Sequence, residues 1–144
     1  MDNCLKNIVL CGVLIAFSTV LAQTEISGEV SGEWSTEGSP YVIIEHTVIN
    51  ADDDLTVLPG VIIEFEPNGY IELNGTLSLN GTKRDSIIFT GDSHRGYIRN
   101  SLDQFSNAQF IASYIRMNFY NHFQGSYNYF DVTNSSFSFI DIAV

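Results

Sequence analysis

The sequence predicts an all-β fold in which the chain coils on itself with three short strands per turn. Between Tyr41 and Thr90 the apolar runs are short, rich in Val, Ile and Thr, and bounded by turn residues, a pattern typical of strands. No stretch of this region has the apolar period of a helix. The runs also recur in one order of three at offsets of roughly 21 to 25 residues, which is typical of a repeating coil.

We expect six strands in this region. They span residues 42–45 together with 47–49, then 55–57, 61–65, 70–73, 76–79 and 86–90. The separators contain pairs such as Pro59-Gly60 and Asn74-Gly75. Gly and Asn accept the backbone conformations that tight corners require, so these separators predict corners between the strands.

Two all-β arrangements compete, hairpins that close a sandwich and a coil of three strands per turn. Alignment of the chain with itself favours the coil. The matched segments are 47–49 with 70–73, 55–57 with 76–79, 61–65 with 86–90, and, further on, Asn107–Phe110 with Asn134–Phe137. A rival register is the repeat Val-Ile-Ile-Glu at positions 42 and 61, which would make the turn shorter.

Four segments together resemble a known family. They are Ser39–Ile43 (SPYVI), Leu55–Phe65 (LTVLPGVIIEF), Ile71–Thr82 (IELNGTLSLNGT) and Asp85–Thr90 (DSIIFT). Their order, turn residues and spacing closely resemble the opening turns of bacterial secreted right-handed parallel β-helix proteins with the pectin lyase-like fold. The resemblance implies a right-handed parallel β-helix with three strands per coil and about five coils, in which Val, Ile, Leu and Phe form inward columns.

The first 22 residues have the pattern of a signal peptide. Lys6 precedes an apolar run, Ile8–Leu21, that is shorter than the ~20 residues of a spanning helix. The run ends on Val20-Leu21-Ala22, which predicts cleavage after Ala22 and a secreted or cell-surface protein with no membrane span after cleavage. The alternative is an uncleaved N-terminal anchor, because Asp2 weakens the basic segment.

The remaining chain divides into two parts. We expect residues 23–40, which are polar around Trp34, to cap the first coil, and residues 41–144 to form the coils. The last residues, 137–144, are apolar and no polar cap follows them. We therefore expect a solenoid truncated at its C-terminus, with edge-to-edge self-association at that end.

Charge and cysteine content exclude several classes of function. The formal net charge is −11, so nucleic acid and anionic membrane surfaces are poor partners. Cys4 and Cys11 both lie in the signal segment, which leaves the mature chain without a disulfide or a thiolate site. Basic residues after Lys6 occur only between Lys83 and Arg116, so the first half of the mature chain is an acidic surface.

The densest charge cluster is Asp52-Asp53-Asp54 beside Asn50. Carboxylate and amide oxygens are ligands for Ca²⁺, so the cluster is a candidate calcium site and the one cofactor site that the sequence offers. The competing interpretation is a solvated turn between coils, because successive side chains on a strand point to opposite faces.

Tyrosines are the candidate ligand-binding residues. The chain after Thr90 is rich in aromatic residues, and Tyr114, Tyr120, Tyr127 and Tyr129 alternate there with Asn and Gln. Aromatic faces stack on sugar rings, and amides bind hydroxyl groups. The competing interpretation is that these tyrosines pack inside the coils or at their edges.

No catalytic residue is predicted. Glu45, Glu64, Glu66 and Glu72 lie on or beside predicted strands, but stacked coils produce outward carboxylate ladders without any catalytic role. Polygalacturonase-like β-helices carry Gly-His-Gly and Arg-x-Lys segments, which this chain lacks. The residues Lys83-Arg84-Asp85 are interpreted as surface charges in a turn.

The leading functional hypothesis is a non-catalytic secreted or cell-surface β-helix domain that binds polysaccharide or another surface component. The alternative is the N-terminal part of a polysaccharide lyase or glycoside hydrolase whose active site lies outside this chain. A third hypothesis is a structural stalk of an adhesin without a ligand of its own. Fold alone does not choose among them.

Overall fold

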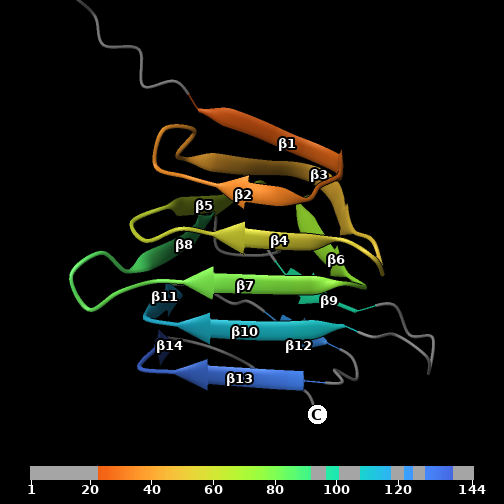
Figure 1. Ribbon diagram of the computed structural model, residues 1–144. Coiled ribbons are helices and arrows are strands. Elements are labelled where there is room, and N and C mark those ends of the chain that lie inside the picture. Colours follow the sequence, from red (N-terminus) through yellow and green to blue (C-terminus); the bar gives the residue numbers. More distant parts are fainter. Residues whose placement is uncertain (1–22, 92–96, 101–107, 118–121, 125–128, 138–144) are drawn as a thin grey trace, which may run out of the picture.

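The computed structural model describes residues 23–91, 97–100, 108–117, 122–124 and 129–137. These residues form strands and turns and contain no helix (Figure 1). The strands are β1 (Thr24–Glu29), β2 (Gly32–Trp34), β3 (Tyr41–Ile49), β4 (Asp54–Val57), β5 (Ile62–Phe65), β6 (Tyr70–Leu73), β7 (Thr76–Asn80), β8 (Ile87–Gly91), β9 (Tyr97–Arg99), β10 (Gln109–Ser113), β11 (Ile115–Met117), β12 (His122–Gln124), β13 (Tyr129–Thr133) and β14 (Ser136–Phe137). The protein is all-β, as the sequence predicts.

The six expected strands are confirmed as β3 to β8, with ends that differ by at most one residue. They form because apolar and polar residues alternate along each of them. In β6 and β7, for example, every second residue is buried, since a strand turns successive side chains to opposite faces. This alternation fixes which side of each strand faces the interior.

The strands pair in parallel and form three stacks. The β7 stack consists of β2, β4, β7, β10 and β13, which lie one below another in Figure 1. The long strand β3 belongs to both other stacks. Its first half leads through β5, β8 and β11 to β14, which we call the β8 stack, and its second half leads through β6 and β9 to β12, which we call the β9 stack.

Parallel pairing rules out the hairpin arrangement for the described part of the chain, because hairpins join antiparallel strands. The chain visits the three stacks in turn and returns one strand further along each. The result is a solenoid-like molecule whose parallel sheets curl around a common interior (Figure 1).

The registers of the paired strands confirm one match of the sequence alignment and correct another. Leu55 lies opposite Leu77, as the repeat predicts. In the β8 stack Ile62 lies opposite Ile88, whereas the sequence match sets Val61 against Ser86. Side-chain alternation decides this shift, because it places Ile63 and Phe89 together in the interior.

Two other repeats do not describe the register. The segments that begin at Val42 and Val61 are neighbours, but Val42 lies opposite Glu64, so the shorter repeat is coincidental. The match of Asn107–Phe110 with Asn134–Phe137 is wrong as a register. Phe110 pairs with Phe130 in the β7 stack, whereas Phe137 pairs with Met117 in the β8 stack. The shared letters therefore belong to strands of different stacks.

The interior is filled by columns of apolar side chains, one column for each inward position of a stack. Leu55, Leu77 and Phe110 form one such column, and all three are buried. In the neighbouring stack the rings of Phe65 and Phe89 stack with centroids 6.3 Å apart. Full burial of such side chains contributes about 1.5–3 kcal/mol each, so the columns hold the three stacks together.

The segment expected to cap the first coil contributes strands. β1 pairs with β3, and β2 pairs with β4. The buried Trp34 stacks on Tyr41 at 4.5 Å between ring centroids. Residues 23–40 therefore extend the stacks beyond β3 and β4, and Trp34 and Tyr41 belong to the apolar core. The capping role of this segment stays a prediction.

The expected signal peptide at residues 1–22 and the expected open end at residues 138–144 lie outside the described residues. Secretion, truncation and edge-to-edge association stay predictions. Among the residues that the structure describes, no helix is long and apolar enough to cross a membrane.

Candidate functional site

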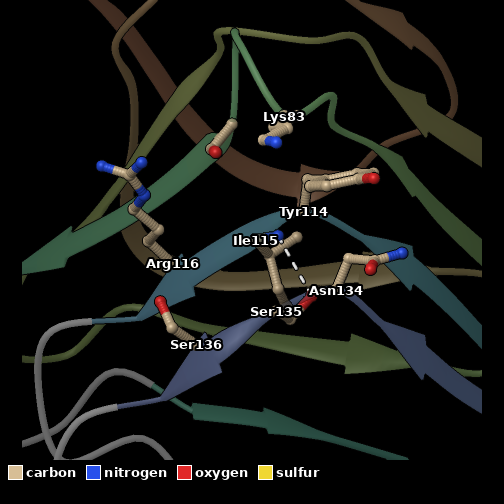
Figure 2. Close-up of a pocket in the computed structure, with 8 residues that line it drawn as sticks. Lys83, Tyr114, Ile115, Arg116, Asn134, Ser135 and Ser136 are labelled. Atoms are coloured by element: carbon tan, nitrogen blue, oxygen red, sulfur yellow. Dashed lines mark hydrogen bonds between the residues drawn. The ribbon is translucent and has the colours of Figure 1, made fainter.

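A polar groove lies at the corner where the chain passes from the β7 stack to the β8 stack (Figure 2). Its main cavity has a volume of about 430 Å³. The lining residues are Lys83, Ser86, Tyr114, Ile115, Arg116, Asn134, Ser135 and Ser136. A second hollow of about 240 Å³ shares Ser86 and Arg116 and continues toward Arg84 and Gly60. We call the two hollows together the corner groove.

The groove exists because successive corners differ in length. The chain passes from β10 to β11 through the single residue Tyr114, and from β13 to β14 through Asn134 and Ser135. The corresponding corner between β7 and β8 is the longer loop 81–86, which carries Lys83 and Arg84. A long loop beside two tight corners leaves a hollow between them.

The tight corners use the left-handed backbone conformation. Tyr114 has φ 50° and Asn134 has φ 51°, and the pairing of Ser113 with Thr133 puts them at equivalent positions of successive turns. Asn tolerates this conformation, whereas a bulky side chain in it is an outlier that costs about 1–2 kcal/mol. Strained residues of this kind concentrate at functional sites.

Hydrogen bonds fix the backbone around Tyr114. Its N–H donates to the Thr133 carbonyl at 3.1 Å, and its own carbonyl accepts from the Ile87 N–H at 3.2 Å. The N–H of Ile115 donates to Ser135 Oγ at 3.1 Å, the contact drawn in Figure 2, and that hydroxyl donates to the Thr133 carbonyl at 2.8 Å. Both neighbouring turns therefore hold this corner in place.

The groove gathers positive charge in an acidic protein. Lys83, Arg84 and Arg116 are exposed and line it, and none of the three forms an ion pair within the described part of the chain. Asp85 is the one carboxylate among the described lining residues. The groove thus offers cations, hydroxyl groups, an amide and an aromatic ring.

A second polar cluster lies on the outer face of the β9 stack, and we call it the Glu72 cluster. Glu72 Oε2 lies 3.2 Å from Arg99 Nη2 and 3.3 Å from His46 Nε2. Arg99 also donates to Tyr70 Oη at 3.2 Å, and Asn74 donates to Glu72 Oε1 at 3.4 Å. The charges of Glu72 and Arg99 are therefore paired within the cluster.

Both faces of the Tyr70 ring are occupied in this cluster. His46 stacks on it with centroids 4.6 Å apart, and the Arg99 guanidinium lies 4.5 Å from its centroid. His46 comes from β3 and Arg99 from β9, the two strands that flank β6, so they cover opposite faces. A sugar ring therefore has no free face of Tyr70 on which to stack.

Glu72 is ionised more readily than an ordinary glutamate. Burial by itself raises the pKa of Glu72, but the hydrogen bond from Asn74 and the hydrogen bond and charge of Arg99, with a smaller contribution from His46, outweigh it. The pKa therefore lies below the ordinary value of 4.5.

Of the tyrosines predicted to bind ligand, Tyr114 lines the corner groove. Tyr120 and Tyr127 lie outside the described residues. Tyr129 begins β13 opposite Gln109, and its side chain is not among those described. Glycan contact by these three stays a prediction.

The aspartate cluster lies at the corner before β4. Asp53 accepts a hydrogen bond from Asn50 Nδ2 at 3.1 Å, and its N–H donates to the Asn50 carbonyl at 3.0 Å. Asp52 and Asp54 are exposed. Among the described residues no group of three or more His, Cys, Asp or Glu side chains is placed to hold a metal ion. Calcium binding at this corner stays a prediction.

Sequence reasoning missed most of the groove. It interpreted Lys83 and Arg84 as surface charges in a turn, and it gave Ser135 and Ser136 no role in binding. The one available signal was the confinement of the basic residues to the segment from Lys83 to Arg116, because it indicates that positive charge gathers in one region.

The described residues define an all-β protein of parallel, solenoid-like construction with a polar groove at one corner. Comparisons with protein-family models, with curated proteins and with solved structures found no match. The assignment of function therefore depends on the groove itself.

Proposed function

We propose that this chain forms an exported right-handed parallel β-helix that binds a glycan in the corner groove without catalysing a reaction. The resemblance of residues 39–90 to secreted β-helix proteins and the parallel strand stacks support the fold. Right-handed connection is the rule for parallel strands joined by a crossover. The signal pattern of residues 1–22 supports export to the cell surface or beyond.

Tyr114 is the observation that carries the proposal. Its backbone is held in a strained conformation by hydrogen bonds to Thr133 and Ile87, and its side chain lines the groove beside Asn134 (Figure 2). A sugar ring presents an apolar face and a rim of hydroxyl groups, which match an aromatic ring beside an amide and serine hydroxyls. A preformed site loses little conformational entropy when it binds.

The composition of the groove favours binding over hydrolysis. Glycoside hydrolysis uses two carboxyl groups roughly 5 to 10 Å apart, and Asp85 is the one carboxylate among the described lining residues. A rigid parallel stack with such a groove is suited to act as a platform that holds a surface polysaccharide.

One observation favours the second candidate, the N-terminal part of a polysaccharide lyase. A lyase needs a base and a positive charge beside the carboxylate of its substrate, and Lys83 and Arg116 line the same cavity. Formation of unsaturated sugar ends from an acidic polysaccharide would support this candidate. Binding without turnover would support the platform.

A glycan array with matched variants tests the proposal. Tyr114→Asn removes the ring but keeps a residue that accepts the left-handed conformation, so the fold is retained. We expect its dissociation constant for the bound glycan to rise at least about tenfold, as expected for the loss of a stacking contact of ~1.4 kcal/mol. The control Tyr70→Asn makes the same change in the Glu72 cluster and leaves binding unchanged.

Two results would contradict the proposal. One is a folded wild-type chain that binds no glycan at high concentration. The other is equal weakening by Tyr114→Asn and Tyr70→Asn, because a contact in the groove cannot depend on a ring of the β9 stack.

A further inference from the structure

The positive charge of the described chain is divided unequally between two places. Arg99 lies in the β9 stack and is paired with Glu72. Lys83, Arg84 and Arg116 line the corner groove and have no ion-pair partner within the described residues. No Lys or Arg occurs between Glu25 and Glu72, so the groove is a positive site on an otherwise acidic molecule.

The strand register explains why Arg116 forms no ion pair with the residues that the structure describes. A residue on a parallel strand has as neighbours the residues in register above and below it. Arg99 has Glu72 at such a position. Arg116 lies between Ile88 and Ser136, which offer no negative charge. Among the described residues, the register thus gives Arg116 no carboxylate neighbour, and an anionic group from outside the chain can take that place.

The cations of the groove line two adjoining hollows, and Arg116 belongs to both. Lys83 and Arg116 line the larger hollow, and Arg84 and Arg116 line the smaller one. Like charges that share a hollow repel each other, and an anion between them would remove this repulsion. Guanidinium groups bind the oxygens of carboxylate and sulfate in a two-pronged geometry, and Ser86, Ser135 and Ser136 supply further hydroxyl donors.

The groove also extends along the stack. The smaller hollow is lined by Ile62 of β5 and Ile88 of β8, and the larger one by Ser136 of β14, while Arg116 of β11 belongs to both. The site therefore crosses successive strands, which are about 4.8 Å apart in such stacks. A polymer that carries repeated negative groups can reach both hollows at once.

We infer that the corner groove selects glycans that carry anionic groups, either sulfate esters or carboxylates, through Lys83, Arg84 and Arg116. The inference rests on the proposed function, because it specifies the ligand of the same site. The acidic surface of the first coils repels such a polymer and confines it to the groove.

Three polymers with one backbone test the inference. Dextran, carboxymethyl-dextran and dextran sulfate differ in their charged groups, and their binding to the purified chain is measured by calorimetry at low and high salt. We expect at least one of the anionic polymers to bind ten or more times more tightly than dextran, and the difference to shrink as salt screens the charges. The preferred polymer identifies the anionic group.

Charge-matched variants locate the site. Arg116→Gln and Arg99→Gln each remove one positive charge, the first inside the groove and the second outside it. We expect Arg116→Gln to weaken binding of the anionic polymer about tenfold, Lys83→Gln combined with Arg116→Gln to weaken it further, and Arg99→Gln to leave it nearly unchanged. Lys83 and Arg116 are exposed, so we expect these variants to keep the fold. Thermal unfolding of each variant checks this.

The possible outcomes separate the two proposals. Equal affinity for dextran and for both anionic polymers would overturn the inference and leave glycan binding standing. Equal weakening by Arg116→Gln and Arg99→Gln would also overturn it, because it would show general charge attraction. Binding to none of the polymers, nor to any glycan of the array, would remove the proposed function and the inference together.

Discussion

The Glu72 cluster and the corner groove each contain an arginine on the outer face of a parallel strand, but they differ in whether its charge has a partner. The Glu72 cluster is built mainly of strand residues, whereas the groove joins Arg116 of β11 to residues of the loop 81–86 and of the tight corners. In the β9 stack the register sets Arg99 beside Glu72, and the charges neutralise each other. In the β8 stack the register sets Arg116 beside Ile88 and Ser136, and its charge has no partner within the described residues. Strand register thus decides whether an outward ladder is a closed cluster or an open site.

The largest expected change in stability tests whether the stacks that carry the Glu72 cluster and the corner groove share one core. Phe89 is fully buried, stacks on Phe65 and lies opposite Ile63 and Met117. Phe89→Ala is expected to lower the free energy of unfolding by about 3–5 kcal/mol, as measured by chemical denaturation. A stability close to that of wild type, with lost groove binding, would show that the β8 stack is independent of the rest.

Two glycines at corners allow a sharper comparison. A Cβ at Gly75 would collide with the carbonyls of Asn50 and Asp53, and one at Gly81 would collide with the carbonyls of Ser113 and Tyr114. Gly75→Ala and Gly81→Ala are each expected to cost about 1–3 kcal/mol of stability.

Their effects on binding should differ. Gly81→Ala displaces the corner that holds Tyr114, so we expect it to weaken glycan binding, whereas Gly75→Ala leaves the remaining folded protein with normal affinity. Denaturation and binding measured on the same samples check this. Equal losses of affinity would mean that the groove depends on overall stability rather than on its own corner.

Substitutions at the two left-handed positions are expected to change stability less, and in opposite directions. Tyr114→Asn is expected to raise the free energy of unfolding by about 1 kcal/mol, because Asn tolerates φ 50° better than Tyr. Asn134→Tyr places a bulky residue at the equivalent corner and is expected to lower it by a similar amount. Destabilisation by Tyr114→Asn in thermal unfolding would show that ring packing outweighs backbone strain.

The smallest effect concerns the closed cluster. Glu72→Gln is expected to cost about 0.5–1 kcal/mol at neutral pH, the range of a partly exposed ion pair. Because the folded-state pKa of Glu72 lies below 4.5, its contribution is complete above that pH and disappears as the pH falls through the lowered value. The difference between wild type and variant in denaturation should therefore vanish in acid. A difference that persists would mean that shape, not charge, matters at this position.

The strands between Tyr41 and Gly91 could be predicted because their signal is local. Alternation in Tyr70–Leu73 and Thr76–Asn80 fixes both the strands and their inward sides, and the recurrence of Leu55 at Leu77 correctly predicts stacking. The register of β5 against β8 was not predictable from matched letters, because it depends on which side chains share the interior.

The sequence by itself determined the all-β class, the boundaries of β3 to β8 to within one residue, the acidic first half and the confinement of basic residues after Lys6 to the segment from Lys83 to Arg116. Only the tertiary structure decided that Lys83 and Arg116 line one hollow with Tyr114 and Asn134. Strand propensity and charge reside in neighbouring residues. A groove, by contrast, arises from the unequal lengths of corners on successive turns and from the register that stacks them.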